Sequence, residues 1–368
     1  MASITKYQTK TGHAWRVQYR SPDGKNRTKR GFRTKALALT WAAKNTVDVT
    51  TGQWTDPNKA KITLNDIGTA WLQHQTHLKP STYRVVEQSW RVHVQPRWGN
   101  HQIGTIKPSA VQEWVASMDR SASTVRKAHA CLAQILDTAV QDGMIKMNPA
   151  RGVRLPRKAK GKHVYLTATQ VGELAGECSV HSEIVWVLAT TGIRWGELAA
   201  LRVQDVDFLR RRLHIVRNAV TVGSQVHVGT PKTHERRTVA IPAFVLDMLA
   251  PLCAGKAREE LLWARTDGDY MRVPSSNTWY YGALKRTMER DRDFPRVTIH
   301  GLRHVAAGLL VSQGANVKVV QRQLGHASAV MTLDTYSDLF DEDLDAVGNL
   351  MDEAFRNAVK MQSAGQFS

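Results

Sequence analysis

Polar and apolar positions alternate in the first part of the chain and then change to a helical period. Residues 12–32 alternate apolar and basic side chains around the turn "SPDG", which predicts a β-hairpin. The next segment, "TKALALTWAAKNTVDVTTG", predicts a helix that ends at Gly52. We therefore expect residues 1–60 to form a small module, a three-stranded sheet backed by one helix.

From residue 62 to residue 150 the apolar positions recur every three to four residues. Breaks occur at "KPST", at "RWGNHQIGTIKPSA" and at Asn148-Pro149. This pattern predicts about four helices and a helical domain over 62–150.

Residues 165–340 are predicted to be mostly helical with one β-rich insertion. The segments "RRLHIVRNAV", "SQVHV" and "RRTVAIP" alternate as strands do, and "GTPKTHE" is the expected turn between the last two. The expected fold class is mainly α with small β elements, an α+β chain. The tail, residues 341–368, is acidic with an apolar stripe, which predicts an amphipathic helix that packs on its own domain or docks on a neighbouring protomer.

Charge indicates the kind of partner. The chain has 51 Lys and Arg against 32 Asp and Glu, a net charge of +19, which favours a polyanion because bound phosphates release counterions. Residues 1–60 carry 12 basic against 3 acidic residues, and the linker 151–164 begins with "RGVRLPRKAKGK". The alternatives are a solvated hairpin and a linker that is basic for solubility alone. The predicted DNA contacts are Arg16, Arg20, Lys25, Arg27, Lys29, Arg30, Arg33, Arg154, Arg157, Lys158 and Lys160.

Several classes of protein are disfavoured. Cys131, Cys178 and Cys253 lie far apart in apolar contexts, which suggests a reducing compartment and neither a disulfide framework nor a zinc cluster. No segment approaches the roughly 18 apolar residues of a membrane helix. The start of the chain lacks an apolar signal segment, so we expect neither secretion nor a membrane partner.

Two segments place charged or imidazole groups at predicted helix ends. Arg194 lies where a helix is expected to begin, against the macrodipole, and Glu197 lies one turn later on the same face. An anionic ligand would resolve that conflict, although a plain surface ion pair explains it too. His300 and Arg303 share one helical face opposite an apolar stripe. His304 follows them and could equally be buried and hydrogen-bonded.

A metal site is the weaker interpretation of these histidines. His300 and His304 have the spacing of two zinc ligands, but the glutamate of H-E-x-x-H and a third ligand are absent. We therefore expect no metal.

Tyr336 has unusual sequence neighbours for a tyrosine. It lies in "LGHASAVMTLDTYSD", ten positions after His326, among small and polar residues, where we expect it to be accessible to a backbone phosphate. Two arginines can bind a phosphodiester and neutralise the charge of its transition state. A base such as histidine can activate a phenol, whose pKa near 10 makes it a poor nucleophile. A lysine such as Lys232, expected at a turn tip, can protonate the leaving oxygen.

These segments resemble, in order and approximate spacing, the motifs of the tyrosine site-specific recombinases, and the N-terminal arrangement is most similar to phage-type integrases. The resemblance is strongest over 165–340. It implies that Arg194 and Arg303 activate the phosphate, that Glu197 supports Arg194, and that Lys232 is the general acid. It further implies that His300 is a general acid/base, that His326 contacts the phosphate and that Tyr336 is the nucleophile. Gly301 departs from the family, which often has a helix-capping Asp there.

The resemblance also implies partners and domains. Residues 1–60 would bind arm-type DNA sites, 62–150 would bind core-type sites, and 165–340 would be catalytic. The expected assembly is a homotetramer on double-stranded DNA in a bacterial cytoplasm, with a host architectural protein, an excision directionality factor and no cofactor. The alternatives are a type IB topoisomerase and a DNA-binding regulator that has lost catalysis.

Overall fold

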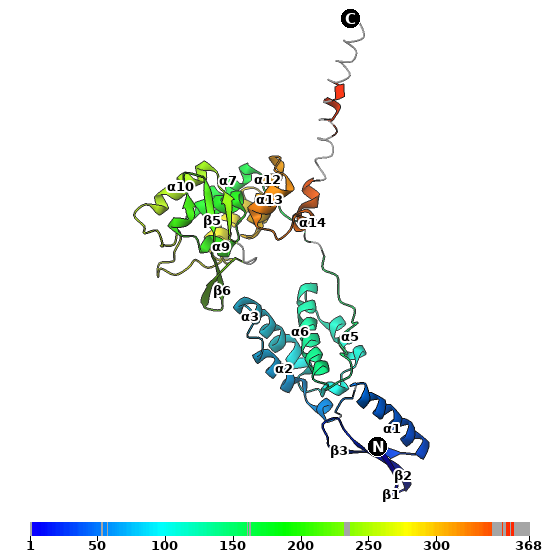
Figure 1. The fold of residues 1–368 in the computed structure, drawn as a ribbon. Helices are drawn as coiled ribbons and strands as arrows, with labels where there is room; N and C mark the ends of the chain where they lie inside the picture. Colours follow the sequence, from blue (N-terminus) through cyan, green and yellow to red (C-terminus); the bar gives the residue numbers. More distant parts are fainter. Residues whose placement is uncertain are drawn as a thin grey trace. The chain divides into compact units, whose positions relative to one another are not determined.

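The computed structural model describes residues 2–52, 54–56, 58–159, 161, 163–231, 236–340, 348, 351–353 and 355–356. The chain divides into two compact units, residues 1–160 and 161–368, coloured blue to cyan and green to red (Figure 1). The division falls inside the predicted basic linker. Both units combine helices with small antiparallel sheets, so the predicted α+β class is confirmed.

The first unit begins with an antiparallel sheet in the order β1 (Ser3–Thr9), β2 (Gly12–Arg20), β3 (Asn26–Phe32). Helix α1 (Lys35–Thr50) packs on one face of this sheet (Figure 1). The predicted hairpin and helix are thereby confirmed. A small separate core forms between them, from Val17, Ala38 and Ala42.

The rest of this unit is helical. Its elements are η1 (Lys59–Lys61), α2 (Leu64–Gln73), α3 (Pro80–Ser89), η2 (Trp90–Val94), α4 (Gln95–Trp98), η3 (Ile103–Thr105), α5 (Pro108–Ser117) and α6 (Ala122–Gln141). Helices α3 and α4 continue into each other through η2, a π-helical turn that precedes Pro96. Proline lacks the donor of the i→i−4 ladder, and the wider turn accommodates that loss. The four helical stretches confirm the prediction for residues 62–150.

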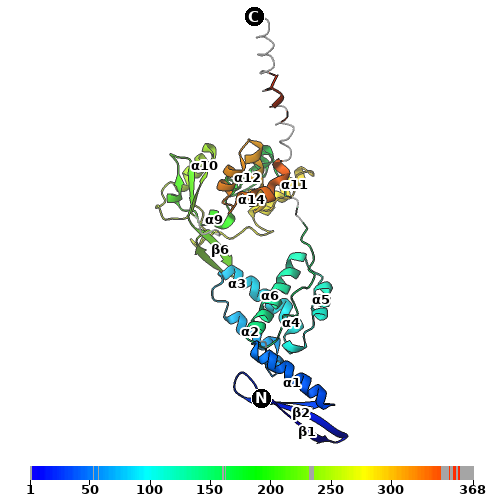
Figure 2. The same cartoon turned by 45° about the vertical axis from the view of Figure 1, so that its right-hand side comes forward.

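The second unit is built on α7 (Ala168–Gly176), α8 (Ser182–Thr191), α9 (Trp195–Ala199), α10 (Ala243–Cys253), α11 (Trp279–Arg290), α12 (Gly301–Ser312), α13 (Val317–Leu324) and α14 (Ala329–Phe340). One sheet has the order β4 (Val206–Asp207), β5 (Arg212–Ile215), β8 (Arg237–Ala240), and β6 (Asn218–Val222) pairs with β7 (Gln225–Gly229). Helix α12 packs against α8, α13 and α14, and Figure 2 shows α12 beside α14.

Two strand predictions are wrong in detail. The predicted strand 211–220 is divided between β5 and β6, which belong to different sheets. Arg217, which lies in the break between them, pairs with Asp205 (2.6 Å). Strands β7 and β8 also lie in different sheets. The segment "GTPKTHE", of which residues 232–235 lie outside the described residues, therefore joins strands of different sheets.

The predicted amphipathic tail lies largely outside the described residues. Within 341–368 the described residues, 348, 351–353 and 355–356, are helical. Docking of this tail stays a prediction.

Candidate active site

Arg194 and Glu197 lie at the junction of α8 and α9. Helix α8 ends at Gly192, whose φ of +66° favours glycine, and a Cβ there would lie 2.3 Å from Leu324 Cδ2. Arg194 is the N-cap of α9, as predicted. The carboxylate of Glu197 accepts hydrogen bonds from the Arg194 backbone N–H (2.8 Å) and from its Nη1 (3.1 Å). The pair thus closes the first turn of α9.

Arg237, from β8, provides a second guanidinium to the same carboxylate. Its Nη1 and Nη2 donate to Glu197 Oε1 and Oε2 at 2.9 and 2.7 Å. The Glu197 side chain is fully buried, and burial by itself raises the pKa of a carboxyl, but the hydrogen bonds and charges of Arg237 and Arg194 hold this pKa below its ordinary value. Glu197 is therefore an anion fixed between two cations.

Arg303, on α12, is a buried cation with an open donor. Its Nη1 donates to the carbonyl of Gly192 (2.6 Å), and its Nη2 is buried without a hydrogen-bond partner among the described residues. Burial, followed by the charge of Arg194, lowers the pKa of Arg303 to about 9. A buried unpaired donor on a cation is costly, and an anion bound beside Arg194 would remove that cost.

His326 follows α13 in a turn at Gly325, whose φ is +68°. A Cβ on Gly325 would lie 2.7 Å from Arg237 Nε, so this turn lies directly against Arg237. The Nδ1 atom of His326 is 2.9 Å from Oγ1 of Thr332, a fully buried residue of α14. Burial and the charge of Arg303 lower the pKa of His326 to about 4, so the ring is neutral at pH 7.

Tyr336 is buried, which corrects the expectation that it is accessible. Its exposed fraction is 0%, and it packs in a cluster with Ala307, Val311, Val320 and Leu324. The apolar pocket accepts a phenol because His304 Nδ1 lies 3.1 Å from the Tyr336 hydroxyl and satisfies it. The Tyr336 and His326 rings stack at 6.1 Å with an interplanar angle of 11°.

The backbone and the charge around Tyr336 are also unusual. Its φ and ψ of −125° and 24° interrupt the helical geometry of α14. Burial raises the pKa of the phenol, while Arg303 and Arg194 act in the opposite direction. Tyr336 is therefore protonated at neutral pH in this pocket.

Helix α12 begins one residue after His300, which is exposed. The His300 ring lies 5.6 Å from the His304 ring. Thr298 Oγ1 accepts a hydrogen bond from the Gly301 N–H (3.0 Å), so the helix start keeps a polar partner without the family's Asp. A Cβ at position 301 would lie 2.8 Å from Val297 Cγ2. Lys232 lies outside the described residues.

The basic residues predicted to contact DNA are mostly exposed. Arg16 and Arg20 alternate with buried Val17 and Tyr19, which directs them away from α1. The exposed members besides Arg20 are Lys25, Lys29, Arg30, Arg33, Arg154, Arg157 and Lys158, whereas Arg16 is half-buried. Lys160 lies outside the described residues.

Arg27 departs from this set. Both its Nη atoms donate to Asp56 (2.6 Å each), Nη2 also donates to Asp23 (3.2 Å), and the guanidinium lies over the Trp54 ring at 5.1 Å. This guanidinium already has two carboxylate partners. It joins the sheet to the segment after α1 and is not an open cation.

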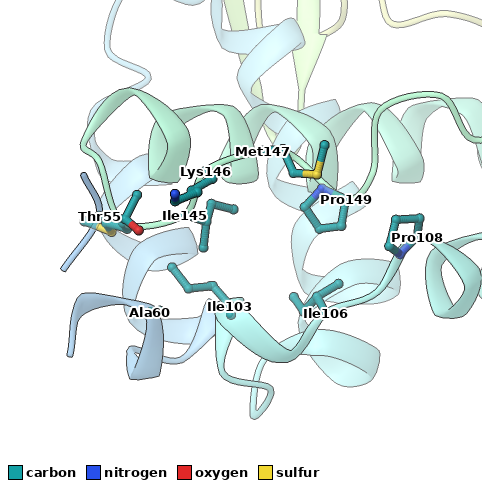
Figure 3. A pocket seen from close by; sticks show the side chains of 11 residues that line it. Thr55, Ala60, Ile103, Ile106, Pro108, Ile145, Lys146, Met147 and Pro149 are labelled. Carbon is teal, nitrogen blue, oxygen red and sulfur yellow. The ribbon is translucent and has the colours of Figure 1, made fainter. Parts of the chain in front are cut away.

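A cavity of about 310 Å³ lies in the first unit (Figure 3). Its lining is largely apolar, with side chains such as Ile103, Ile145 and Pro149. The charge of Lys146 is paired with Asp48 at 2.6 Å. This cavity is formed within residues 1–160 and takes no part in the cluster around Tyr336.

Within the described ranges, no group of three or more His, Cys, Asp or Glu side chains is arranged to hold a metal ion. No helix of the described part is both long and apolar enough to cross a membrane. The three cysteines are free, and burial raises the pKa of Cys131 to about 12.

Three residues that contact the predicted site residues were not themselves predicted as site residues. Thr332 precedes Tyr336 by one helical turn, a spacing that could have indicated it. For His304 the sequence leaves open a site role or a buried, hydrogen-bonded one, and the structure places it half-buried with Nδ1 3.1 Å from the Tyr336 hydroxyl. Arg237 had no local signal, because its position depends on the pairing of β8 with β5, 22 to 28 residues earlier in the chain.

Residues 165–343 match the phage integrase family, and residues 63–118 match the phage integrase N-terminal SAM-like domain. The integrase of Mycobacterium phage D29 is 28% identical over 321 residues, which cover 83% of this chain and 84% of that protein. The structure of the Tn1549 transposon integrase in complex with a circular intermediate DNA has a TM-score of 0.66 and 22% identity, and covers 75% of this chain and 95% of that one. A lambda integrase tetramer bound to a Holliday junction has a TM-score of 0.55 and 17% identity, over 88% and 96%. The two matched segments are more than half of the chain, which belongs to the phage integrase family of tyrosine recombinases.

Proposed function

We propose that this chain is an integrase that cuts and rejoins two DNA duplexes through a 3′-phosphotyrosyl intermediate. One observation supports this most strongly. Tyr336 packs on α12, the helix that carries Arg303, and the Arg303 guanidinium acts on the pKa of its phenol. The buried Nη2 of Arg303 has no partner among the described residues. A phosphodiester is an anion that suits this donor, and the tyrosine beside it is a nucleophile.

The proposed roles follow from the contacts of each side chain. Arg194 and Arg303 bind the non-bridging oxygens and stabilise the charge that develops on them. Glu197 and Arg237 hold Arg194 in position. His326, oriented by Thr332, contacts the phosphate.

The remaining roles of the proposed set concern proton transfer. Lys232 protonates the departing 5′ oxygen, and His300 is a general acid/base. Tyr336 forms the covalent link. The phosphotyrosyl link keeps the energy of the broken phosphodiester, so the reaction requires no nucleotide cofactor.

The burial of Tyr336 adds a step to this proposal. A fully buried phenol cannot meet a DNA strand, so the pocket must open before attack. The interrupted helical geometry at Tyr336 is a natural point for this movement, because the residues before and after it are not held in one continuous helix.

Domain functions are part of the proposal. Residues 1–60 bind arm-type sites, 62–150 bind core-type sites, 151–164 link them to the catalytic domain 165–340, and the tail docks on a neighbouring protomer. The lambda integrase relative is a tetramer on a Holliday junction. A homotetramer that exchanges strands in pairs is therefore the proposed assembly, assisted by a host architectural protein and an excision directionality factor in a bacterial cytoplasm.

Two other functions are considered. The first would use the same chemistry, and the second would use only the positive charge. A type IB topoisomerase would relax one supercoiled duplex without joining two. A DNA-binding regulator would bind without forming adducts. Incubation with two different labelled duplexes separates the three, since only the integrase produces joined strands.

The test of the proposed nucleophile is Tyr336→Phe, with Tyr270→Phe as a matched control outside the cluster. The probe is a pool of nicked duplexes of random sequence, enriched for those that wild type converts to covalent adducts. Tyr336→Phe is expected to abolish adducts while DNA affinity changes less than about threefold, because only a hydroxyl is lost. Adducts that survive the substitution would remove Tyr336 from its role.

The same probe tests the expectation of a metal-free reaction. EDTA is expected to leave adduct formation unchanged. A strong loss would indicate a metal-dependent reaction instead.

A further inference from the structure

Two stacked histidines lie beside Tyr336, and one of them contacts its hydroxyl. His304 Nδ1 is 3.1 Å from the Tyr336 hydroxyl, and the His304 ring stacks on the His163 ring, with centroids 4.0 Å apart and an interplanar angle of 25°. The His163 ring also lies 6.0 Å from the Tyr336 ring. Neither histidine belongs to the set that the family resemblance implies. The tyrosine hydroxyl nevertheless already has a nitrogen partner in its resting position.

The surroundings of His304 keep its ring uncharged. Burial, followed by the charges of His163, His300, Arg303 and His326, lowers the pKa of His304 to about 4. His163 faces it from the linker, His300 and Arg303 face it from the N-cap and first turn of α12, and His326 faces it from the turn after α13. Tyr336 faces it from α14. The ring is therefore neutral at pH 7 and can accept a proton. A phosphate bound to Arg303 and Arg194 offsets these positive charges and makes the ring a stronger base.

Building on the proposed function, we propose that His304 is a catalytic residue that accepts the phenolic proton of Tyr336, and that His163 is a positioning residue that holds the His304 ring. In this assignment the phenolic proton passes to His304 and not to His300, because His304 Nδ1 lies 3.1 Å from the Tyr336 hydroxyl and, as the unprotonated ring nitrogen, accepts its hydrogen bond. Proton transfer requires such contact between the base and the proton that it takes, so the proposal includes that the Tyr336 hydroxyl keeps its contact with His304 when the pocket opens to the DNA strand.

Tyr336 Oη forms a bond to phosphorus, and the phenolic proton passes to His304 Nδ1. The bond from phosphorus to the 5′ oxygen breaks, and its electron pair stays on that oxygen. The 5′ oxygen receives a proton from Lys232, the acid of the proposed set. Rejoining reverses each transfer, so His304 returns the proton to the phenol.

His163 is held where the basic linker meets the second unit. It follows the stretch 151–162 directly, and Leu166, three residues later, is buried. Tyr165 packs into the space left by Gly308 on α12, where a Cβ would lie 2.8 Å from Tyr165 Cδ1. These contacts anchor the chain directly after Val164, next to His163, whose ring stacks on His304. The stack therefore connects the predicted DNA-contacting linker to the proton acceptor.

The first test replaces His304 by Asn, whose amide can take the place of Nδ1 in the hydrogen bond but cannot take a proton. Adduct formation on the enriched nicked pool is expected to fall about 100-fold in His304→Asn. His181→Asn is the matched control, since His181 lies at the start of α8 and its left-handed backbone suits Asn. Equal rates for His304→Asn and wild type would overturn the proposal.

The pH profile separates a chemical role from a structural one. Wild-type adduct formation is expected to change little between about pH 6 and pH 9, because neutral His304 takes the proton. In His304→Asn the phenol must lose its proton to solvent, so the rate should rise about tenfold per pH unit. A parallel profile for both proteins, at lower amplitude in the variant, would show that His304 only supports the fold.

A sulfur-substituted substrate tests which proton is concerned. A duplex with sulfur in place of the bridging 5′ oxygen needs no acid, since a thiolate leaves without a proton. The defect of His304→Asn is expected to persist on this substrate. Recovery of the wild-type rate would place His304 on the leaving-group side and would contradict the proposal.

The positioning role of His163 is tested by substitutions that keep or remove its aromatic ring. His163→Phe keeps an aromatic ring on His304 and is expected to retain adduct formation within about threefold, whereas His163→Ala should lose about tenfold. Failure of His163→Phe to exceed His163→Ala would remove the positioning role.

These outcomes are distinct from failure of the proposed function. If wild type forms no adducts on any pool, the proposed function itself fails. If wild type forms them and His304→Asn forms them equally well, only this inference fails.

Discussion

Glu197 is a buried carboxylate that two arginines hold in place. Arg237 and Arg194 both donate to it, at 2.7 to 3.1 Å. Removing one member of a buried ionic cluster leaves the others without compensation, which is the costly case. The carboxylate therefore stabilises the turn between α8 and α9 and the position of Arg194 together.

Glu197→Gln is expected to lower the free energy of unfolding by about 3 kcal/mol at pH 7. The pKa of Glu197 is depressed in the folded state, so its contribution is fully present above the unfolded pKa and is lost as pH falls through the folded value. The difference between wild type and variant should therefore be largest above about pH 5 and shrink below about pH 4. Urea unfolding at several pH values measures it.

Glu177→Gln is the matched control for this prediction. Glu177 pairs with Arg286 and Arg290, whose side chains are about half exposed, so its loss should cost less than about 1 kcal/mol. Equal losses for the two variants, or a difference that does not change with pH, would contradict the account of Glu197.

Local spacing predicts pairs within one helix turn, and the structure confirms the placement of Arg194 at the start of α9 beside Glu197. For His304, local spacing leaves a buried, hydrogen-bonded position as one of two alternatives. The burial of Tyr336 could not be read in this way, because its apolar neighbours come from α12 and α13 while its sequence neighbours are polar. Arg237 was missed for the same physical reason. Its position is set by strand pairing and not by nearby residues.

At the scale of elements, α2 packs closely on the π-helical turn η2. A Cβ on Gly68 of α2 would lie 2.2 Å from Cη2 of Trp90, whose ring is almost fully buried. The contact leaves no room for a methyl group. Gly68 is therefore required by packing, although glycine within a helix is unfavourable.

Gly68→Ala is expected to destabilise the first unit by about 1–3 kcal/mol, because overpacking outweighs the gain in helix propensity. Thermal unfolding measures the change. Gly172→Ala in α7 is the matched control. Its Cβ would lie 3.5 Å from Trp186, an ordinary contact, so it should stabilise by about 0.5–1 kcal/mol. Stabilisation by Gly68→Ala would mean that α2 and η2 are not packed as described.

The predicted helices and the N-terminal hairpin are the elements that the sequence determines best. Their signals are local, such as the turn after Arg20 and the stop at Gly52. The pairing of strands in the β-rich insertion could not be predicted from the sequence, because alternation identifies a strand but not its partner. The run 211–220 supplies strands to two sheets, and Arg217, between these strands, pairs with Asp205.

At the scale of the whole molecule, positive charge is concentrated in the N-terminal module. Residues 1–52 hold eleven Lys and Arg and two Asp, about half of the net charge of +19. Their core is separate from that of the helices that follow. A protein without them can therefore keep the other cores.

Deletion of residues 2–52 is expected to abolish binding at arm-type sites and to flatten the dependence of log affinity on log salt between about 50 and 200 mM. Fluorescence anisotropy with labelled duplexes measures both. Within the full chain, Lys29→Gln should reduce the slope by about 0.9, and Arg27→Gln should leave it unchanged because Asp56 and Asp23 already neutralise that guanidinium. An unchanged slope after the deletion would refute the assignment of this module to DNA binding.

The proposed reaction attaches DNA covalently to one side chain. The most direct measurement traps wild-type protein on the enriched nicked duplexes, digests it with trypsin and sequences the DNA-linked peptide by mass spectrometry. The predicted peptide is 323–356, which contains Tyr336 as its single tyrosine. Attachment of the 3′ phosphate to Tyr336 is the expected result. A DNA-linked peptide from any other part of the chain, or attachment through a 5′ phosphate, would contradict the account.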